Sequence, residues 1–259
     1  MRFCSLSSGS EGNALLVEAQ ASGAATVRFL VDCGLGLREA EARLAQRGLS
    51  PAELDFIYVT HEHGDHIGGV AKLARAHNIP VLATHGTVTA VGPDFWSGVS
   101  VACVSSHRSL QVDGISINPI PVPHDAREPV ALVLEDAQHR MAIVTDLGHQ
   151  TPHLTAALEG LDAIFLEFNY DETLLREGNY PASLKSRIDG PYGHLSNRAS
   201  AEVLSAVCSS RLQHVIAAHL SRQNNSPELV LESVTGLDLQ QAHFRCASQH
   251  EGFDWVTLS

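Results

Sequence analysis

The sequence predicts an α/β fold, and two observations lead to this class. The chain has 259 residues, 44% of them hydrophobic, which suffices for a large core in one domain or in two small ones. Along the chain, short apolar runs alternate with amphipathic segments of helical spacing. The run at 56–59 (Phe-Ile-Tyr-Val), for example, is typical of a buried strand and precedes a helix-like segment at 70–76.

Local signals place the individual elements. Apolar runs predict strands, and amphipathic segments bounded by Gly or Pro predict helices. Thr151 before Pro152 is typical of a helix N-terminus, and Ser196 is a candidate N-cap of a later helix. Strands are expected at 3–6, 13–18, 27–32, 56–59, 80–84, 99–104, 115–122, 130–135, 141–145, 162–168, 214–218 and 253–258. Helices are expected at 37–46, 70–76, 198–207 and 227–235.

Charge and composition bear on partners and location. The net charge of −12, from 17 basic and 29 acidic residues, argues against nucleic-acid binding mainly through a basic face. No apolar run approaches the roughly 20 residues of a membrane span, and residues 1–10 lack the apolar stretch of a signal peptide. Scattered cysteines, odd in number, favour reduced thiols and a cytoplasmic location. These cysteines are Cys4, Cys33, Cys103, Cys208 and Cys246.

The most informative stretch directly follows the strand expected at 56–59. It places His61, His63, Asp65 and His66 close together. Such a cluster is costly to bury unless a cation pairs with it, and imidazole and carboxylate both suit a metal such as zinc. The i, i+2 spacing puts His61 and His63 on one side of an extended segment. Asp65 and His66, at the turn that follows, can face a second ion. The alternative is a solvated polar turn.

Three more candidate ligands occur singly later in the chain. His124, Asp146 and His219 each follow an apolar strand, and strand ends are where α/β folds place their chemistry. For any one of them alone, a structural role would be the simpler interpretation. Their occurrence in series after the first cluster favours a shared site.

The spacing His61-x-His63-x-Asp65-His66 matches the H-x-H-x-D-H signature, so the chain resembles the metallo-β-lactamase fold hydrolases. The resemblance covers nearly the whole chain and implies a single hydrolase domain over residues 1–259. The implied fold is the four-layer αβ/βα sandwich, in which two mixed β-sheets pack face to face with helices on their outer faces. The predicted strands are compatible with this arrangement.

The resemblance also implies a dinuclear site with two divalent metal ions, with Zn²⁺ favoured and Mn²⁺ as the alternative. One ion would be held by His61, His63 and His124, the other by Asp65, His66 and His219, and Asp146 would bridge them. Asp32 would orient a ligating histidine from outside the ligand set. Two such ions can share a hydroxide and clamp the oxygens of a displacement, and Asp65 would orient or deprotonate the attacking water.

Three dispersed motifs narrow the resemblance to the bacterial YycJ/WalJ group, single-domain enzymes related to the nucleases tRNase Z and RNase J. They lie at 7–13, 193–197 and 219–225. The first alone could be an ordinary turn or a loop whose N–H groups approach an anion. By the resemblance His194 is a general acid, with a helix-capping histidine as the alternative. The residues expected to contact substrate are Ser8, Ser10, Asn13, Ser196, Asn197, Arg222 and Asn224.

The function that this resemblance implies is phosphodiester hydrolysis by a metal-activated hydroxide, as a nuclease with 5′-to-3′ DNA exonuclease activity. The chain departs from its larger relatives, because the 73 residues between Asp146 and His219 are too few for the β-CASP domain of RNase J. It also lacks an evident long arm like that of tRNase Z. Nucleic acid would then be held by the metals and a few basic side chains, namely Lys185, Arg187, Arg198 and Arg222.

Two other functions compete with the nuclease. The acidic net charge favours a small-molecule hydrolase, such as a cyclic phosphodiesterase, a thioesterase like glyoxalase II or a lactonase. A decayed, metal-binding regulatory protein is the non-enzymatic alternative. The complete set of seven candidate ligands argues against decay.

Overall fold

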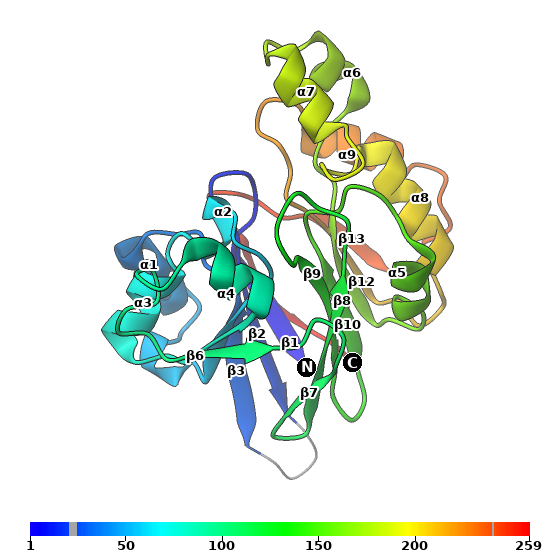
Figure 1. Cartoon of the computed structure of the whole chain (residues 1–259). Helices are drawn as coiled ribbons and strands as arrows, with labels where there is room; N and C mark the ends of the chain where they lie inside the picture. The colour runs from blue at the N-terminus through cyan, green and yellow to red at the C-terminus, as the bar shows by residue number, and fades with distance from the viewer. Residues whose placement is uncertain (21–24, 240) are drawn as a thin grey trace.

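Two seven-stranded sheets pack face to face and carry helices on their outer faces (Figure 1). The structure is a computed structural model that describes residues 1–20, 25–239 and 241–259. Over this part of the chain the layers run helix, sheet, sheet, helix. The four-layer fold predicted for the sequence is therefore confirmed.

The first sheet joins the two ends of the chain. In spatial order its strands are β14 (Phe253–Thr257), β1 (Arg2–Ser7), β2 (Ala14–Gln20), β3 (Thr26–Val31), β4 (Phe56–Val59), β5 (Val81–Thr84) and β6 (Val101–Val104). The pairs from β14 to β3 are antiparallel, and those from β3 to β6 are parallel. The last strand thus lies beside the first.

The second sheet has the same mixture of parallel and antiparallel pairs. In spatial order its strands are β13 (His243–Cys246), β12 (His214–Ala218), β11 (Ala163–Glu167), β10 (Arg140–Val144), β9 (Val130–Glu135), β8 (Ile115–Pro121) and β7 (Leu110–Val112). The pairs from β13 to β10 are parallel, and those from β10 to β7 are antiparallel. Strand β8 therefore runs in the same direction as β10, β11 and β12.

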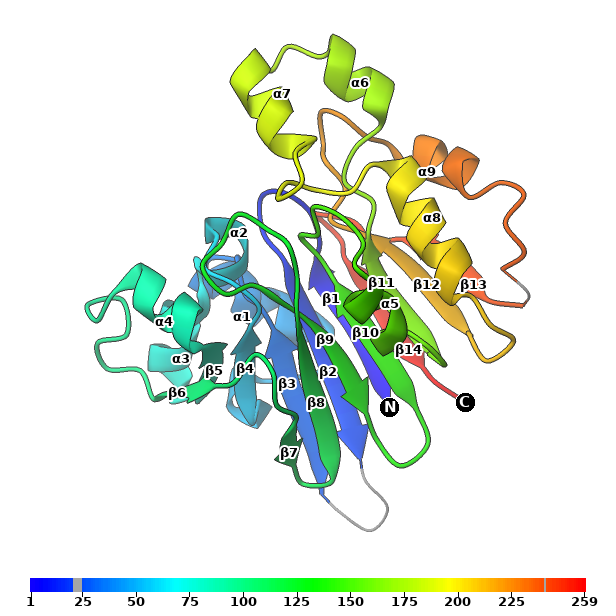
Figure 2. The ribbon, with the colours of Figure 1, turned by 45° about the vertical axis from the view of Figure 1, so that its right-hand side comes forward.

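The helices cover the outer faces of the two sheets, and two of them project beyond the sheet edge (Figures 1 and 2). On the first sheet lie α1 (Leu37–Gln46), α3 (Val70–His77) and α4 (His85–Val91), while α2 (Gly64–Ile67) lies at the edge of the sheet. The 3₁₀ turn η1 (Pro51–Glu53) contacts α3. On the second lie α5 (Pro152–Ala157), α8 (Asn197–Val207) and α9 (Pro227–Ser233). The projecting pair is α6 (Glu172–Glu177) and α7 (Ala182–Ile188). None of the described helices has the length and apolar character needed to cross a membrane.

Three apolar clusters fill the three interfaces between the four layers. Strand alternation sends neighbouring residues to opposite faces, as β3 shows. Phe29 and Val31 join the cluster between the sheets, whereas Leu30 joins the cluster under α1 and α3. Phe165 of the second sheet belongs to the same central cluster as Phe29. The third cluster lies between the second sheet and α5, α8 and α9.

Most predicted elements are present, and the missed ones have weak local signals. Helix α1 spans the predicted residues 37–46, and Thr151 and Ser196 cap α5 and α8 by accepting backbone N–H bonds. Helix α4 was not predicted, because its sequence (His-Gly-Thr-Val-Thr-Ala-Val) is poor in helix-forming residues. It is fixed instead by its surroundings: Thr84 caps it and also donates to the carbonyl of Glu128.

Candidate metal centre

The candidate ligands meet at one edge of the two sheets. Six strands end there, three of them parallel neighbours in the second sheet, and the polar residues follow directly after the apolar runs. The strands are β3, β4, β8, β10, β11 and β12. Because carboxyl ends of strands that run the same way share an edge, residues far apart in sequence come into contact. Helix α2, which carries Asp65 and His66, lies at this edge in Figure 1.

Three site residues adopt the left-handed backbone conformation as the chain leaves its strand. The φ angles are 61° at Asp32, 56° at Asp146 and 55° at His219. This region is uncommon for residues other than glycine and costs about 1–3 kcal/mol where the surroundings enforce it. Its recurrence at three strand ends of one site indicates that the backbone is bent there to aim the side chains.

His61, His63 and His124 form a first group, the imidazole trio, whose nitrogens lie within 4.8 Å of one another. His124 Nε2 is 3.1 Å from His63 Nδ1. His61 Nε2 is buried and has no hydrogen-bond partner within the described chain. Burial lowers the pKa of His61 well below its usual value and also lowers that of His124, so both are neutral near pH 7. An unpartnered neutral nitrogen facing two others is the arrangement that a divalent ion needs.

Asp65, His66 and His219 form a second group, the carboxylate trio, again with ligand atoms within 4.8 Å. Asp65 Oδ2 is 3.1 Å from His219 Nε2 and 3.4 Å from His66 Nε2. Burial disfavours the charged imidazole of His219, but Asp146, Asp65 and Glu167 outweigh it and raise the His219 pKa to about 10. The same balance, with Asp146 as the main partner, raises the pKa of His66 well above its usual value.

Asp146 lies between the two trios. Its Oδ2 is 2.9 Å from His66 Nε2, and its Oδ1 is 3.6 Å from His124 Nε2 and 3.8 Å from His219 Nε2. Burial disfavours the carboxylate, yet the positive charges of His219 and His66 hold the Asp146 pKa well below its usual value. The side chain can therefore offer one oxygen to each trio.

The outer nitrogen of several rings is fixed by the protein, which leaves the inner nitrogen free for a ligand. His66 Nδ1 lies 2.7 Å from Asp32 Oδ2, and Asp32 in turn accepts from Thr60 N at 2.8 Å and Thr60 Oγ1 at 2.7 Å. His124 Nδ1 lies 2.9 Å from the carbonyl of Gly193. The structure thus places Asp32 against a candidate ligand, where the resemblance expects an orienting residue.

A glycine two residues after Asp32 allows its loop to meet the loop that carries Asp65. A Cβ atom at Gly34 would lie 2.0 Å from the carbonyl oxygen of Asp65, so no side chain fits there. That carbonyl also accepts from the backbone N–H of Asn13 at 2.8 Å, and Asn13 Nδ2 is 3.1 Å from Asp65 Oδ2. The loop at 7–13 therefore contacts the carboxylate trio directly.

Glu167 is the site residue that the sequence reasoning missed. It ends β11, is fully buried, and its Oε1 lies 2.7 Å from His194 Nδ1 and 3.1 Å from His219 Nδ1. Its Oε2 accepts from the backbone N–H groups of Leu147 at 2.9 Å and Leu195 at 3.2 Å. Burial disfavours the carboxylate, but the charge of His194 and the side-chain bonds to His194 and His219 lower the Glu167 pKa to about 2. A glutamate at the end of an otherwise apolar run was the available signal.

His194 belongs to neither trio but lies beside both. Its Nδ1 is 3.6 Å from Asp146 Oδ1, and its ring centroid is 5.3 Å from that of His124 and 5.4 Å from that of His219. Its loop passes so close to the end of α7 that a Cβ atom at Gly193 would lie 2.1 Å from the carbonyl oxygen of Ile188. The predicted proton donor therefore stands at the site, with its outer nitrogen held by Glu167.

Most of the predicted substrate contacts are buried and bonded within the protein. Ser8 Oγ accepts from the N–H of His219 at 2.9 Å, and Asn13 bonds the carboxylate trio. Ser196 caps α8, Asn197 exchanges two 2.8 Å bonds with Asn225, and Asn224 packs on Ser221. This placement favours holding the loops of the site over the expected contact with substrate.

Two other predicted contacts are exposed. Ser10 lies on the exposed part of the 7–13 loop. Arg222 is half exposed and pairs with Glu11 at 2.5 Å. Both remain accessible from solvent at the rim of the site.

A comparison with protein families covers most of the chain. Residues 27–219 match the family described as a β-lactamase superfamily domain, and this range includes every candidate ligand. The chain belongs to the β-lactamase superfamily. Its fold and its strand-end cluster of histidines and aspartates are those of a metallo-β-lactamase fold hydrolase, a class that uses divalent metal ions.

Two curated relatives of this superfamily member align over most of their length. It is 34% identical over 242 residues to exodeoxyribonuclease YycJ of Bacillus anthracis, covering 91% of this chain and 88% of that protein. It is 32% identical over 233 residues to exodeoxyribonuclease WalJ of Streptococcus pneumoniae, covering 88% of this chain and 84% of that protein. The resemblance to the YycJ/WalJ group inferred from three motifs is thereby confirmed.

A solved structure supports the fold independently. Zinc-bound PqqB from Methylobacterium extorquens superposes with a TM-score of 0.72 at 15% identity, over 100% of both chains. At this identity the similarity concerns the fold.

Proposed function

We propose that this chain hydrolyses phosphodiester bonds of DNA, acting from a 5′ end as an exonuclease. The observation that carries the proposal is the His194–Glu167 pair, a histidine held by a buried carboxylate beside both trios. A phosphodiester releases a poor leaving group, an alkoxide oxygen, and therefore gains most from a positioned proton donor. The activity named for both curated relatives supports this assignment.

The two trios would hold one divalent ion each, with Asp146 shared between them. The donor set, five imidazoles and two carboxylates, suits Zn²⁺, with Mn²⁺ as the alternative. When bound, two ions would lower the pKa of a water and stabilise charge on the phosphoryl oxygens. The unpartnered Nε2 of buried His61 is the structural sign that a cation belongs there.

Asp65 would orient the attacking water. Burial works against its charge, but the positive charge of His66 and the bond to His219 hold the Asp65 pKa far below its usual value. The carboxylate therefore stays ionised at neutral pH and acts as a hydrogen-bond acceptor. Asn13 Nδ2, at 3.1 Å from Asp65 Oδ2, fixes its orientation.

His194 would protonate the leaving oxygen. Burial lowers its pKa, but the charge of Glu167 and the 2.7 Å bond between them outweigh burial and raise the pKa. The Glu167 carboxylate therefore favours the doubly protonated form of the ring, which is the form that can act as a proton donor. The proton on Nδ1 is held by Glu167, and the one on Nε2 can pass to the leaving oxygen as the P–O bond breaks.

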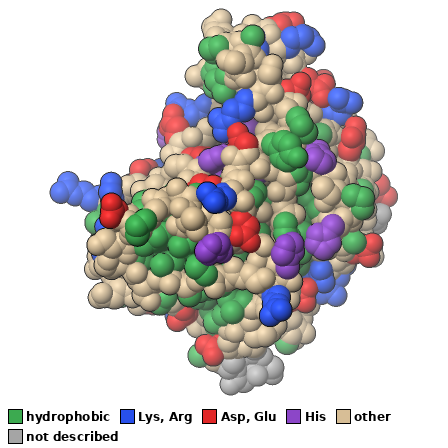
Figure 3. All heavy atoms as spheres, in the orientation of Figure 1, with side chains coloured by type: hydrophobic (Ala, Val, Ile, Leu, Met, Phe, Trp, Pro, Cys, Tyr) green, Lys and Arg blue, Asp and Glu red, His purple; other side chains and the backbone are tan. Residues whose placement is uncertain are grey.

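The protein surface would contribute little to DNA affinity. Acidic and basic side chains are interspersed on the face shown in Figure 3. Arg198 pairs with Glu172, Arg222 with Glu11, and Lys185 donates to the carbonyl of Arg176. We expect two to four phosphate contacts, and hence a slope of about −1.4 to −2.8 for log affinity against log salt on single strands.

The experiment compares substrates with and without an end. End-labelled linear DNA, a covalently closed circle and bis-p-nitrophenyl phosphate are incubated with the Zn²⁺- and Mn²⁺-loaded protein. The proposal expects mononucleotides released from the 5′ end of the linear DNA and slow or no cutting of the circle. Equal cutting of both DNAs would contradict the exonuclease assignment.

A small-molecule hydrolase is the second candidate, and the acidic net charge of −12 favours it. The same assay includes a cyclic nucleotide, a glutathione thioester and a lactone. Fast turnover of one of these, with no cleavage of DNA or RNA, would assign the protein to that class.

A further inference from the structure

We propose that Tyr192 is a stacking platform for a nucleobase next to the scissile phosphodiester. The inference rests on the proposed function and adds the contact through which this acidic protein would hold the terminal nucleotides of a DNA strand. Base–aromatic stacking needs no net charge and tolerates every base. It therefore suits a nuclease whose cations are mostly bound to its own acidic groups.

Tyr192 is unusually exposed for a large apolar side chain. It is 59% exposed, and the other large hydrophobic side chains exposed within the described chain are Leu174 on α6 and Leu231 on α9. Isolated exposed leucines on helices need no explanation. An exposed tyrosine on a loop is different, because an aromatic ring in water is a ready contact surface.

The backbone places Tyr192 at the rim of the metal centre. It lies two residues before His194, and its carbonyl oxygen accepts from the N–H of Asp125, which follows His124. The backbone of Tyr192 also passes close to Gly148, where an added Cβ atom would lie only 2.7 Å from the Cα of Tyr192. The tyrosine is thus in contact with the loops that carry two candidate ligands, His124 and Asp146.

The loop that carries Tyr192 is held on both sides. The carbonyl of Pro191 lies 2.8 Å from His149 Nδ1, and the carbonyl of Gly193 lies 2.9 Å from His124 Nδ1. Gly193 also donates its N–H to Gly190 at 2.9 Å. A ring on such a fixed segment loses little conformational freedom when a base stacks on it, which favours binding.

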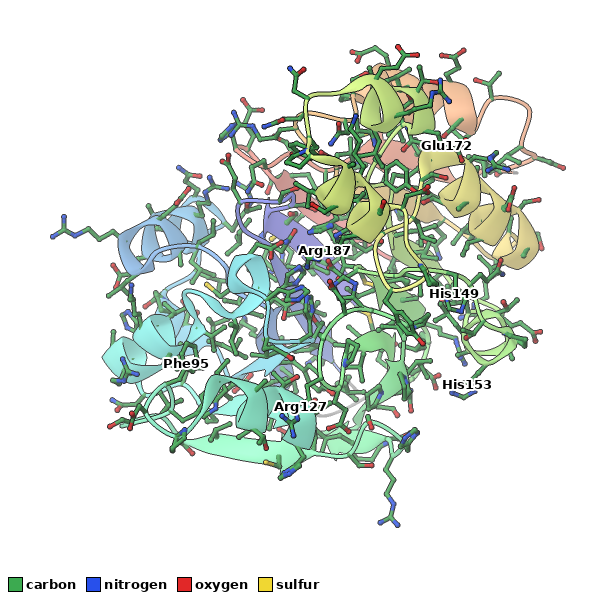
Figure 4. The ribbon with its side chains drawn as sticks, turned by 45° about the horizontal axis from the view of Figure 1, so that its top comes forward. Phe95, Arg127, His149, His153, Glu172 and Arg187 are labelled. Carbon is green, nitrogen blue, oxygen red and sulfur yellow. The ribbon has the colours of Figure 1, made fainter. Side chains whose placement is uncertain are left out.

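Arg187 and Tyr192 share a partner, Asp125, whose N–H donates to the carbonyl oxygen of Tyr192 at 3.0 Å. Arg187, at the end of α7 nearest the centre of Figure 4, contacts Asp125 at 2.5 Å, whereas Glu172 lies farther out. Of the four basic side chains expected to bind nucleic acid, it is the one whose partner adjoins a candidate ligand. A guanidinium here would meet the backbone of a strand whose base rests on Tyr192.

The test measures, for each protein, the ratio of kcat/KM on a normal strand to kcat/KM on a strand that lacks the terminal bases. Two single-stranded DNAs are compared, one normal and one with abasic residues at both 5′-terminal positions, and kcat/KM is measured for each. Stacking contributes about 1–3 kcal/mol per base, so the wild type should favour the normal strand by about 5- to 150-fold. Tyr192→Ala should bring this ratio close to one, and Tyr192→Phe should keep it. The ratio is unaffected by the fraction of active protein.

Leu231→Ala is the matched control, since it removes an exposed apolar side chain from α9, and its ratio should equal that of the wild type. A wild-type ratio near one, or an undiminished ratio in Tyr192→Ala, would overturn the platform while leaving the nuclease assignment intact. Absence of DNA cleavage by the wild type, with turnover of bis-p-nitrophenyl phosphate, would instead overturn the proposed function and the platform with it.

Discussion

The imidazole trio and the carboxylate trio share one edge of the fold but differ in how the protein supports them. In the first, His61 Nε2 has no partner in the described chain, and the pKa values of His61 and His124 are lowered, chiefly by burial. In the second, the pKa values of His66 and His219 are raised, because nearby carboxylates outweigh burial. Burial thus favours the neutral form of His61 and His124, and His61 keeps an unpartnered nitrogen, whereas His66 and His219 favour the charged form and are already bonded to carboxylates.

The two trios also differ in the residues that contact their histidines from outside, which are more numerous around the carboxylate trio. Asp32 and Asn13 contact His66, and Glu167 and Ser8 contact His219. The imidazole trio has Thr60 Oγ1 on His61, one backbone carbonyl on His124 and the half-exposed Asp125 carboxylate 3.6 Å from His63 Nε2. The comparison indicates that a cation would displace fewer protons at the imidazole trio, where the pKa values of His61 and His124 are lowered, than at the carboxylate trio, where those of His66 and His219 are raised.

The largest effect is expected from the residue that the trios share. Asp146→Ala removes the carboxylate lying 2.9 Å from His66 and 3.6 Å from His124, and leaves excess positive charge between two bound ions. We expect loss of at least one metal equivalent and hydrolysis close to the background rate. Metal content is measured by elemental analysis beside the rate on bis-p-nitrophenyl phosphate. Two equivalents with near-normal turnover would show that the trios work without a bridge.

The next effect separates proton donation from metal binding. His194→Ala should lower turnover by about 10²–10⁴-fold, the usual worth of a general acid, without loss of metal, because His194 belongs to neither trio.

Glu167→Gln should weaken the affinity for the metal ion held by His219 by about 10- to 100-fold, because Glu167 orients the His219 ring.

The measurements for these two variants are metal affinities and rates on two substrates, one with a p-nitrophenolate and one with an alkoxide leaving group. The rate loss in His194→Ala should shrink for p-nitrophenolate, which needs no proton. Equal losses on both substrates would make His194 a positioning residue. Unchanged metal affinity in Glu167→Gln would show that the carboxylate trio does not depend on this support.

A smaller effect tests the protonation difference directly. In His61→Ala the carboxylate trio is left intact, and metal binding near pH 7 should release about two protons, from His66 and His219, whose pKa values are raised. In His219→Ala the imidazole trio is left intact, and binding should release fewer protons, because the pKa values of His61 and His124 are lowered.

The measurement is calorimetric titration of Zn²⁺ in buffers with different ionisation enthalpies. Since the His219 pKa is about 10, its proton is lost as the pH rises toward that value, and the release in His61→Ala should shrink accordingly. Equal proton release by both variants would remove the distinction between the trios.

The smallest effect concerns the support of the 7–13 loop. Gln249 Nε2 donates to Ser7 Oγ at 2.7 Å and to the carbonyl of Gly12 at 2.9 Å, and its Oε1 accepts from the N–H of Glu11. Gln249→Ala should weaken metal binding at the carboxylate trio by up to about tenfold, a loss at the low end for outer partners, and spare the imidazole trio.

Gln111→Ala on β7 is the control for Gln249→Ala, because its side-chain amide bonds Ser116 on the exposed side of a hairpin. Metal affinities of both variants are measured by competition with a chromogenic chelator. A weaker imidazole trio in Gln249→Ala would show that the loop supports the whole edge.

The sequence by itself determined the positions of most strands, because apolar runs of strand length are a local signal. The candidate ligands were also visible locally, as histidines and aspartates directly after such runs, for example His61 and Asp146. The four-layer class came from the resemblance to the metallo-β-lactamase fold hydrolases, with which the predicted strands were compatible. Local capping was also readable, since Thr151 and Ser196 act on residues three positions away.

Only the tertiary structure decided the pairing of groups distant in sequence. Glu167 meets His194 across 27 residues and His219 across 52, and no local pattern records a contact that depends on parallel strands ending at one edge. The division of the ligands into an open and a bonded trio, and the exposure of Tyr192, follow from the same packing. Burial and charge act through space, so they set the pKa values and the accessible surface only once the sheets have come together.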